Sequence, residues 1–232
     1  MERRHEVTRL EGFSDAVFGF ALTLLVVSLE VPKDIDHLAN QMKGFLPFAL
    51  MFAMICWIWY EHQRYFRNYG LQDAWVIAVN SFLLFVVLFY VYPLKFLTIG
   101  LLGRPLGLEG APVLGAQSDV VMLLYSSGVV MIFGAFVLLY RHAWSRREAL
   151  ALTPAELVTL RFSKRAHILS ASLGVVSIGI VLIGRAVHND IYAFFAGILY
   201  ALMGPIHGWN GYMAGKAHEQ LRKAAAAADA KR

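Results

Sequence analysis

Ionisable side chains inside apolar stretches are the residues of this chain with the most potential for chemistry. The clearest case is Asp15, which lies about two turns inside the run RLEGFSDAVFGFALTLLVVSLEVP, from Arg9 to Pro32. An ionised group at membrane depth costs at least about 3 kcal/mol on insertion scales, so it faces the protein interior and finds partners there. Glu30, at the far end of the run, is expected at an outer mouth, where it either tunes a vestibule or is solvated. Asp15 itself serves either a proton or cation relay or a buried network that fixes the helix register.

Two polar residues of later stretches, His62 and Asn80, are suitable partners for Asp15, since both can donate a hydrogen bond to a carboxylate. Arg9 is not suitable, because six residues separate it from Asp15, or about 240° around a helix. If successive helices cross the membrane in alternate directions, one layer near the inner surface holds Arg9, Ser14, Asp15, His62 and Asn80. The later stretches hold no carboxylate at other depths, which favours the network over the relay.

The sequence contains none of the patterns that carry common enzyme or metal chemistry. The eight histidines are scattered without HxxxH or HExxH spacing, and Cys56 is the only cysteine. There is no GxSxG elbow, phosphate-binding P-loop or dinucleotide fingerprint. We therefore expect no enzyme activity, no cofactor and no metal other than a permeating ion.

Six apolar membrane-spanning helices are the elements that must position these residues. Apolar types make up 58% of the 232 residues and charged types 16%, a balance too apolar for an ordinary soluble domain. The uncharged runs approach or exceed the length of about 20 residues that crosses a hydrocarbon core, and they lack barrel-like alternation. The predicted spans are 9–31, 44–65, 74–94, 119–141, 165–185 and 190–214. The fold class is thus all-α and polytopic, with a membrane domain at 1–215 and a tail at 216–232.

The charge distribution indicates an orientation rather than a nucleic-acid partner. The formal net charge is +5 and, with the N-terminal side placed inside, 16 of the 21 Lys and Arg residues fall on the inner side of the predicted spans. Such a bias is the positive-inside signature of multi-pass proteins. We therefore expect both termini in the cytoplasm, the plasma (inner) membrane as location, the lipid bilayer as partner and no nucleic-acid binding.

The connections and the last span carry three further patterns. The outer loop from Lys95 to Asp119 is rich in glycine and proline and is expected to be irregular, whereas Thr153, Pro154 and Glu156 form a capping box that starts a helix leading into the fifth span. The tail is expected to extend the sixth helix. One face of that helix is predicted to pack closely on a neighbour, because it carries Gly204, Gly208, Gly211 and Gly215.

The start of the chain resembles a known channel family. The run RLEGFSD matches the RxxxFSD signature of the transmembrane protein 175 family, the endolysosomal and prokaryotic potassium channels, and its fixed places are filled by Arg9, Phe13, Ser14 and Asp15. The run WYEH from Trp59 to His62, and Asn80 followed by Pro93, also look like family features. The resemblance covers roughly the first 95 residues, and beyond them it extends only to the number of helices.

This resemblance implies a cation channel in which potassium permeates better than sodium, with other monovalent cations also passing. It implies six helices per chain, four chains around a central pore and a pore-lining first helix, with apolar side chains rather than backbone carbonyls at the constriction. Counted from the aspartate of the signature, the constriction falls on Phe20, Leu24 and Val27, with Thr23 on the flank. Phe20 departs from the isoleucine or leucine usual in the family, so it either forms the constriction, rotates as a gate or points into a subunit interface.

Helical geometry agrees with a division of roles along the first helix. Phe20, Leu24 and Val27 follow the spacing i, i+4, i+7 and therefore share one face. Asp15 points about 140° away from Phe20, hence toward neighbouring helices rather than the pore. We expect the signature residues and their partners to anchor this helix in a network that comprises Arg9, Phe13, Ser14, Asp15, Trp59, His62 and Asn80.

The function that these observations favour is a homotetrameric, potassium-permeable channel that conducts passively past a hydrophobic gate. Two alternatives stay open at this point. One is a proton-coupled secondary transporter that uses Asp15 and His62, although the sequence shows no inverted repeat and no pair of broken helices. The other is a non-conducting membrane scaffold, in which substitutions at Leu24 or Val27 leave ion permeability unaltered.

Overall fold

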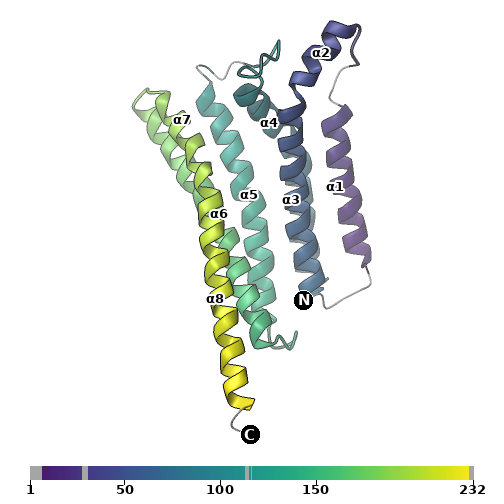
Figure 1. The fold of residues 1–232 in the computed structure, drawn as a ribbon, viewed down its shortest axis with the longest axis vertical. Coiled ribbons are helices and arrows are strands. Elements are labelled where there is room, and N and C mark those ends of the chain that lie inside the picture. The colour runs from purple at the N-terminus through teal and green to yellow at the C-terminus, as the bar shows by residue number, and fades with distance from the viewer. Residues whose placement is uncertain (1–6, 28–30, 113–114, 116, 230–232) are drawn as a thin grey trace.

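The computed structural model describes residues 7–27, 31–112, 115 and 117–229. Its helices are α1 (Arg9–Val27), α2 (Ile35–Lys43), α3 (Phe45–Tyr69), α4 (Ala74–Leu102), α5 (Ser118–Ser145), α6 (Pro154–Ala186), α7 (Ile191–Ile198) and α8 (Met203–Asp229), with a 3₁₀ turn, η1 (Leu199–Leu202), before α8. The described residues form no strand, and six helical segments are long and apolar enough to cross a membrane. The all-α prediction with six candidate spans is therefore confirmed (Figure 1).

The long helices run side by side in one bundle (Figure 1). α1 packs on α3 and α4, α4 packs on α5, and α5 packs on α6, which also contacts α7 and α8. The start of α1 and the end of α8 lie at the same end of the bundle (Figure 1). Within the described part of the chain α1 has no helix partner other than α3 and α4, so one side of α1 is left uncovered.

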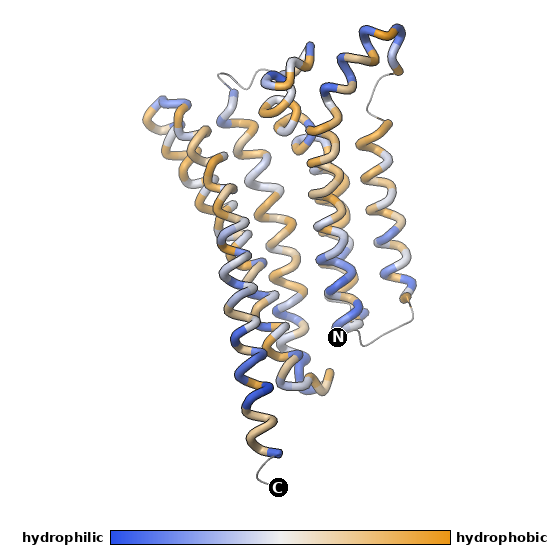
Figure 2. Tube along the Cα trace, in the orientation of Figure 1, coloured by the Kyte–Doolittle hydropathy of each residue, from blue (hydrophilic) through white to orange (hydrophobic). Residues whose placement is uncertain are grey.

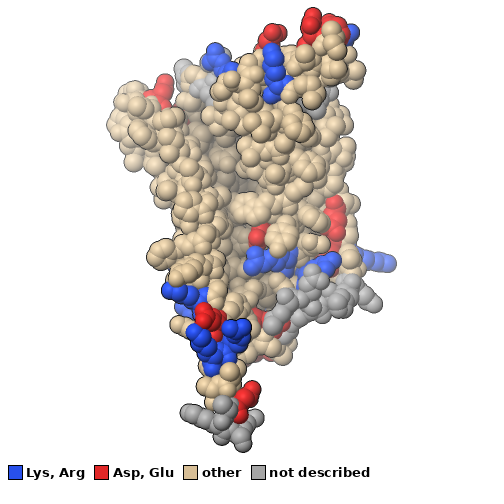
Figure 3. All heavy atoms as spheres, viewed as in Figure 1, with Lys and Arg blue, Asp and Glu red and all other residues tan. Residues whose placement is uncertain are grey.

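The middle of the bundle is apolar along its length and its ends are polar. Figure 2 shows orange, hydrophobic residues through the central turns and blue, hydrophilic residues at the lower ends of α1, α3 and α8. Figure 3 shows Lys, Arg, Asp and Glu gathered toward the two ends of the visible face, with a wide uncharged band between them. This is the distribution expected of helices that cross a hydrocarbon layer.

Side-chain caps fix where several helices begin. Thr153 Oγ1 accepts from the Glu156 N–H at 3.3 Å, and the Glu156 carboxylate accepts from the Thr153 N–H at 2.8 Å. The predicted capping box is thus confirmed, and α6 continues from it without interruption into the fifth span. Thr8 and Glu11 exchange the equivalent hydrogen bonds at the start of α1, a box that was not predicted.

At the end of the bundle opposite the start of α1 and the end of α8, the connections between helices differ from the prediction in two places. A short helix, α2, lies between the first two spans, where Asp34 caps it by accepting from the His37 N–H at 2.8 Å. α4 continues to Leu102, past the predicted end at 94, because the residues after Pro93 stay apolar and a proline removes only one hydrogen bond of the helix ladder. The segment from there to 112 is irregular, as predicted.

The last span is divided by η1. Pro205 has no N–H to give to the Ala201 carbonyl and its ring crowds that group, which explains the tighter 3₁₀ geometry just before α8. α8 then runs to Asp229, so the tail extends this helix as predicted. The predicted close packing of its glycine face is wrong within one chain, because a Cβ would meet no atom of the described residues within 4 Å at Gly204, Gly208, Gly211 or Gly215.

Candidate functional site

Ser14 on α1 is joined to α3 and α4 by a chain of buried hydrogen bonds. Asn80 Nδ2 donates to Ser14 Oγ at 3.0 Å, and Ser14 Oγ donates to the Leu10 carbonyl at 2.8 Å. Because Asn80 uses its amide nitrogen in this way, its Oδ1 accepts from His62 Nε2 at 2.8 Å, which places the His62 proton on Nε2. The structure therefore brings together three members of the predicted polar layer, one from each of three helices.

Asp15 lies beside this chain of hydrogen bonds but is not part of it. Its Oδ1 accepts from Trp59 Nε1 at 2.7 Å, whereas the expected donors to the carboxylate were His62 and Asn80. That expectation is wrong, because neighbouring residues point about 100° apart around a helix, so Ser14 faces Asn80 while Asp15 faces α3. Indole nitrogen only donates and an ionised carboxylate only accepts, so the pair is matched in hydrogen-bonding role.

The other signature residues have no partner within the described chain. Arg9 is exposed at the start of α1, and no hydrogen bond or ion pair joins it to the described residues. Phe13 is also exposed, so its ring does not pack against α3 or α4. Glu30, expected at the outer mouth, lies outside the described residues.

The predicted constriction residues lie on the uncovered side of α1. Phe20 is 57% exposed and Val27 72% exposed, while the opposite face buries Ser14, Phe18, Ala21 and Leu25 against the bundle. Leu24 is half-buried, and at about 100° per residue it stands at the edge of the open face, whereas Thr23 stands almost opposite the packed face. Thr23 Oγ1 donates to the Gly19 carbonyl at 2.8 Å, so its hydroxyl proton is used within the helix.

A second polar cluster, on the other side of α3, was not predicted. Glu61 lies near Arg64 of the same helix and near His167 of α6. The sequence held one signal for it. The fifth span carries small or polar residues at a helical spacing of four, three, four and three, and all are buried: Ser163, His167, Ser170, Gly174 and Ser177.

Neither cluster has the composition of a metal or cofactor site. Among the described residues, no group of three or more His, Cys, Asp and Glu side chains is placed to hold a metal ion. The open face of α1 offers apolar side chains and one hydroxyl, which can exclude or admit an ion but cannot activate a substrate.

Comparison with known proteins gives consistent matches over most of the chain. A family model described as the endosomal/lysosomal potassium channel TMEM175 matches residues 9–93. A potassium channel of Marivirga tractuosa is 37% identical over 214 residues, which cover 88% of this chain and 86% of that protein. A potassium channel of Chamaesiphon minutus is 29% identical over 154 residues, which cover 63% of this chain and 70% of that protein. Among solved structures, a variant of the potassium channel MtTMEM175 in complex with a Nanobody-MBP fusion protein has a TM-score of 0.80 at 36% identity, covering 93% of this chain and 97% of the other.

Proposed function

The chain belongs to the endosomal/lysosomal potassium channel TMEM175 family, and on that premise we propose that four copies of it assemble around a central pore lined by α1. The protein is a potassium channel with membrane-spanning helices, and it is not an enzyme. In the proposed assembly potassium moves passively down its gradient and permeates better than sodium, and other monovalent cations also pass.

The observation that carries this proposal is the uncovered face of α1. α1 buries one face against α3 and α4 and leaves Phe13, Phe20, Thr23 and Val27 without cover from the described chain. Arg9, at the start of the same helix, also has no partner among the described residues. A ring of neighbouring copies accounts for both, with the apolar face toward the pore and Arg9 beside the next subunit.

The pore chemistry follows from the side chains of this face. Apolar rings at Phe20, Leu24 and Val27 would keep the pore dry when it is narrow and would strip part of the water from a potassium ion when it is wide. Potassium is more weakly hydrated than sodium, so partial dehydration favours its passage. Thr23 stands nearer the centre of the face than Leu24, and its oxygen lone pairs are available to a partly dehydrated ion.

The hydrogen-bonded residues behind α1 hold it in place. Asp15 and Trp59 join α1 to α3, and the chain from Ser14 through Asn80 to His62 joins α1 to α4 and α3. Asp15 and His62 have separate partners, which does not support a proton path through these two side chains. Glu30 is proposed at the outer mouth, where four carboxylates would attract cations.

We propose that the end of the bundle that holds the start of α1 and the end of α8 faces the cytoplasm, and that the membrane is the plasma (inner) membrane. The support is the excess of Lys and Arg at that end, which is the positive-inside pattern. The six-helix channel domain then comprises 1–215, and 216–232 form a cytoplasmic extension of α8.

The test is potassium flux through the purified protein in proteoliposomes, with the mass of the assembly measured in detergent. We expect a potassium-driven flux that exceeds sodium flux, and a mass of four chains. Absence of flux from a correctly folded tetramer would refute the α1 pore, and a stable monomer that conducts would refute the assembly.

A further inference from the structure

A group of partly buried ionisable side chains, with one fully buried histidine, lies between α3, α6 and α8, on the side of α3 that faces away from α1. It consists of Glu61, Arg64, His167 and His207, and we call it the Glu61–His167 cluster. The channel function proposed above assigns no role to it. The hollowed part of the face in Figure 3 holds red and blue atoms near the lower border of the uncharged band.

His167 is the least satisfied member of the cluster. Its side chain is 2% exposed and is stacked on the Phe136 ring with centroids 4.7 Å apart, and Tyr140 packs at 5.0 Å. Neither ring nitrogen makes a hydrogen bond within the described chain, although Nε2 lies 3.5 Å from Glu61 Oε2. A buried polar group without a partner is destabilising, so its presence calls for an explanation.

Glu61 is shared between a permanent positive charge and a ring that can become charged. Its side chain is 13% exposed, and Arg64 Nη1 lies 3.3 Å from Oε1 and 3.5 Å from Oε2. Arg64 also donates through Nη2 to Ser163 Oγ at 3.0 Å, so the guanidinium is held between α3 and α6. A proton on His167 would turn the 3.5 Å contact with Glu61 into a charge-assisted hydrogen bond between the same two helices.

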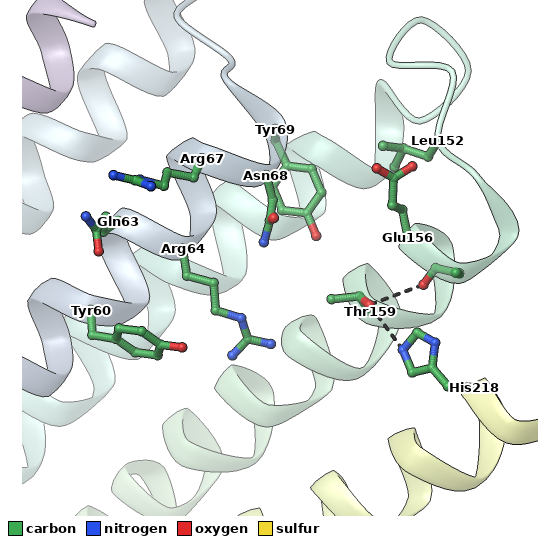
Figure 4. Close-up of a pocket in the computed structure, with 11 residues that line it drawn as sticks. Tyr60, Gln63, Arg64, Arg67, Asn68, Tyr69, Leu152, Glu156, Thr159 and His218 are labelled. Carbon is green, nitrogen blue, oxygen red and sulfur yellow. Dashed lines mark hydrogen bonds between the residues drawn. The ribbon is translucent and has the colours of Figure 1, made fainter. Parts of the chain in front are cut away.

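Two adjoining cavities connect this cluster with the end of the bundle where α8 ends. The inner cavity, of about 270 Å³, is lined by Glu61, His167, His207 and Asn210, whose buried Oδ1 also lacks a partner in the described chain. The outer cavity, of about 580 Å³, shares Arg64, Thr159 and His218 with it (Figure 4). Figure 4 shows the Arg64 guanidinium directed into the space between α3 and α6, across from Thr159 and His218.

The chemistry of the lining restricts what can bind at the inner end. Glu61 and Arg64 cancel each other in charge, which favours neither a larger anion nor a metal cation, and the described residues offer no metal-binding set. Water and a proton fit a small polar cavity with both donors and acceptors. The ionisable groups that share these cavities or pack on His167 come from four helices: Glu61, Tyr60, Arg67 and Tyr69 of α3, Tyr140 of α5, Glu156 of α6, and His207 and His218 of α8.

We propose that His167 and Glu61 form a proton-binding site that is reached through these cavities, and that a proton on His167 ties α6 to α3. On the orientation proposed above, which this inference adopts, the cavities open to the cytoplasm. Glu61 stands two residues after Trp59 and directly before His62, the residues by which α3 holds α1. Proton binding at the cluster therefore acts on the helix that positions the pore.

Nitrogen NMR of histidine-labelled full-length protein in nanodiscs tests the site directly. Between about pH 8 and pH 5 we expect one buried histidine to change from a neutral ring to an imidazolium. This change disappears in His167→Gln, and in Glu61→Gln the ring stays neutral because its counter-charge is gone. The control, His188→Asn, alters an exposed histidine between α6 and α7 and retains the change. If His167→Gln does not fold, the signal is assigned by elimination with variants of the other histidines.

A His167 ring that stays neutral to about pH 5, or that gains a proton equally well in Glu61→Gln, overturns the site. Potassium flux from proteoliposomes over the same pH range then tests the link to the pore, where we expect a change of at least about twofold in the wild type and none in His167→Gln. Proton uptake without this change overturns the link. The NMR measurement does not depend on conduction, so the two proposals can fail separately. Proton uptake by a protein that carries no potassium would refute the proposed pore and leave the proton site standing. Conduction without proton uptake would refute the proton site and leave the pore standing.

Discussion

Two polar clusters lie on opposite sides of α3, and they differ in how completely their groups are paired. On the α1 side, Ser14, Asn80 and Asp15 each have a hydrogen-bond partner with good distance, and of the buried His62 ring only Nδ1 is left without one among the described residues. On the α6 side, His167 has no hydrogen bond from either ring nitrogen to the described residues, although it is as deeply buried. A network with nearly all its groups satisfied fixes one arrangement of helices, while a partly satisfied one can exist in two protonation states. The same helix thus carries a fixed attachment on one side and an adjustable one on the other.

The largest effect on stability is expected from Asn80→Ala, which removes the centre of the satisfied network. Ser14 and His62 both lose a partner in a buried site, and a cavity is left. We expect a loss of about 3 kcal/mol, or a melting temperature lower by roughly 6–12 °C, measured by thermal unfolding in detergent. Asn68→Ala is the control, because Asn68 is half-buried on α3 and makes no hydrogen bond to the described residues. Equal effects of the two substitutions would mean that the network does not hold α1.

A smaller effect is expected from Trp59→Phe, which keeps an aromatic ring but removes the donor to Asp15. The pair is exposed in the single chain, so we expect about 1 kcal/mol and a smaller fraction of assembled protein on size-exclusion chromatography. Trp75→Phe, at an exposed tryptophan near the start of α4, serves as the matched control. If Asp15→Ala gives a stable assembly in which ion selectivity alone has changed, Asp15 belongs to the pore and not to the attachment.

The contact between Asp73 and His142 lies outside the spans and is partly exposed, so it serves as a comparison for the polar contacts of the two clusters. Asp73 Oδ2 lies 2.6 Å from His142 Nε2, and Asp73 Oδ1 accepts from the Val76 N–H at 3.1 Å. Burial raises the pKa of Asp73, but these two hydrogen bonds outweigh it and the pKa is lowered. Asp73 therefore stabilises the fold above the ordinary pKa of about 3.9, and this contribution disappears as the pH falls through the lowered pKa.

Asp73→Asn keeps a residue that can cap α4 and removes the charge. Because the Asp73 side chain is 37% exposed, solvent screening limits the loss to a few tenths of a kcal/mol at pH 7. Thermal unfolding of wild type and variant should differ at pH 7, and the difference should shrink as the pH falls below the ordinary pKa of an aspartate. If the stability difference between wild type and variant grew as the pH fell, the protonated Asp73 would stabilise the fold more than the ionised Asp73, contrary to this prediction.

The unsatisfied cluster is expected to tolerate a substitution that the satisfied one would not. His167→Phe keeps a flat ring between Phe136 and Tyr140 and removes two nitrogens that have no hydrogen bond to the described residues. Replacement of an unpaired polar group by an apolar one of similar shape is close to neutral, so we expect less than about 1 kcal/mol in either direction. A loss as large as that of Asn80→Ala would show that His167 is satisfied in the native state, and the contrast between the two clusters would fail.

The smallest change in stability is expected at the open face of α1. Val27→Ala removes an exposed side chain, so the free energy of unfolding should change by less than about 0.5 kcal/mol. Potassium flux should nevertheless change several-fold, because the ring that it widens would lie in the pore. Val176→Ala, at an exposed valine of α6, should alter neither quantity. Unchanged flux in both Val27→Ala and Leu24→Ala would remove these residues from the constriction.

The fold was largely predictable, because long apolar runs and the capping box at Thr153 are local features of the sequence. The meeting of Ser14, His62 and Asn80 was predictable but the partner of Asp15 was not, since Asp15 and Ser14 are adjacent and only the packed structure shows which faces Trp59 and which faces Asn80. The Glu61–His167 pair was missed because its partners lie far apart in the chain, and α2 was missed because a short interfacial helix has no long periodic pattern.

The separation in sequence between Asp15 and its partner has a consequence for how the protein is made. The two residues of the hydrogen bond are 44 positions apart, with α2 and half of α3 between them. During synthesis α1 leaves the ribosome well before Trp59 exists, so its carboxylate meets the insertion machinery without the group that later neutralises its cost. The hydrogen bond to Trp59 therefore forms only after α3 has been made, so α1 has to enter the bilayer on the strength of its apolar side chains.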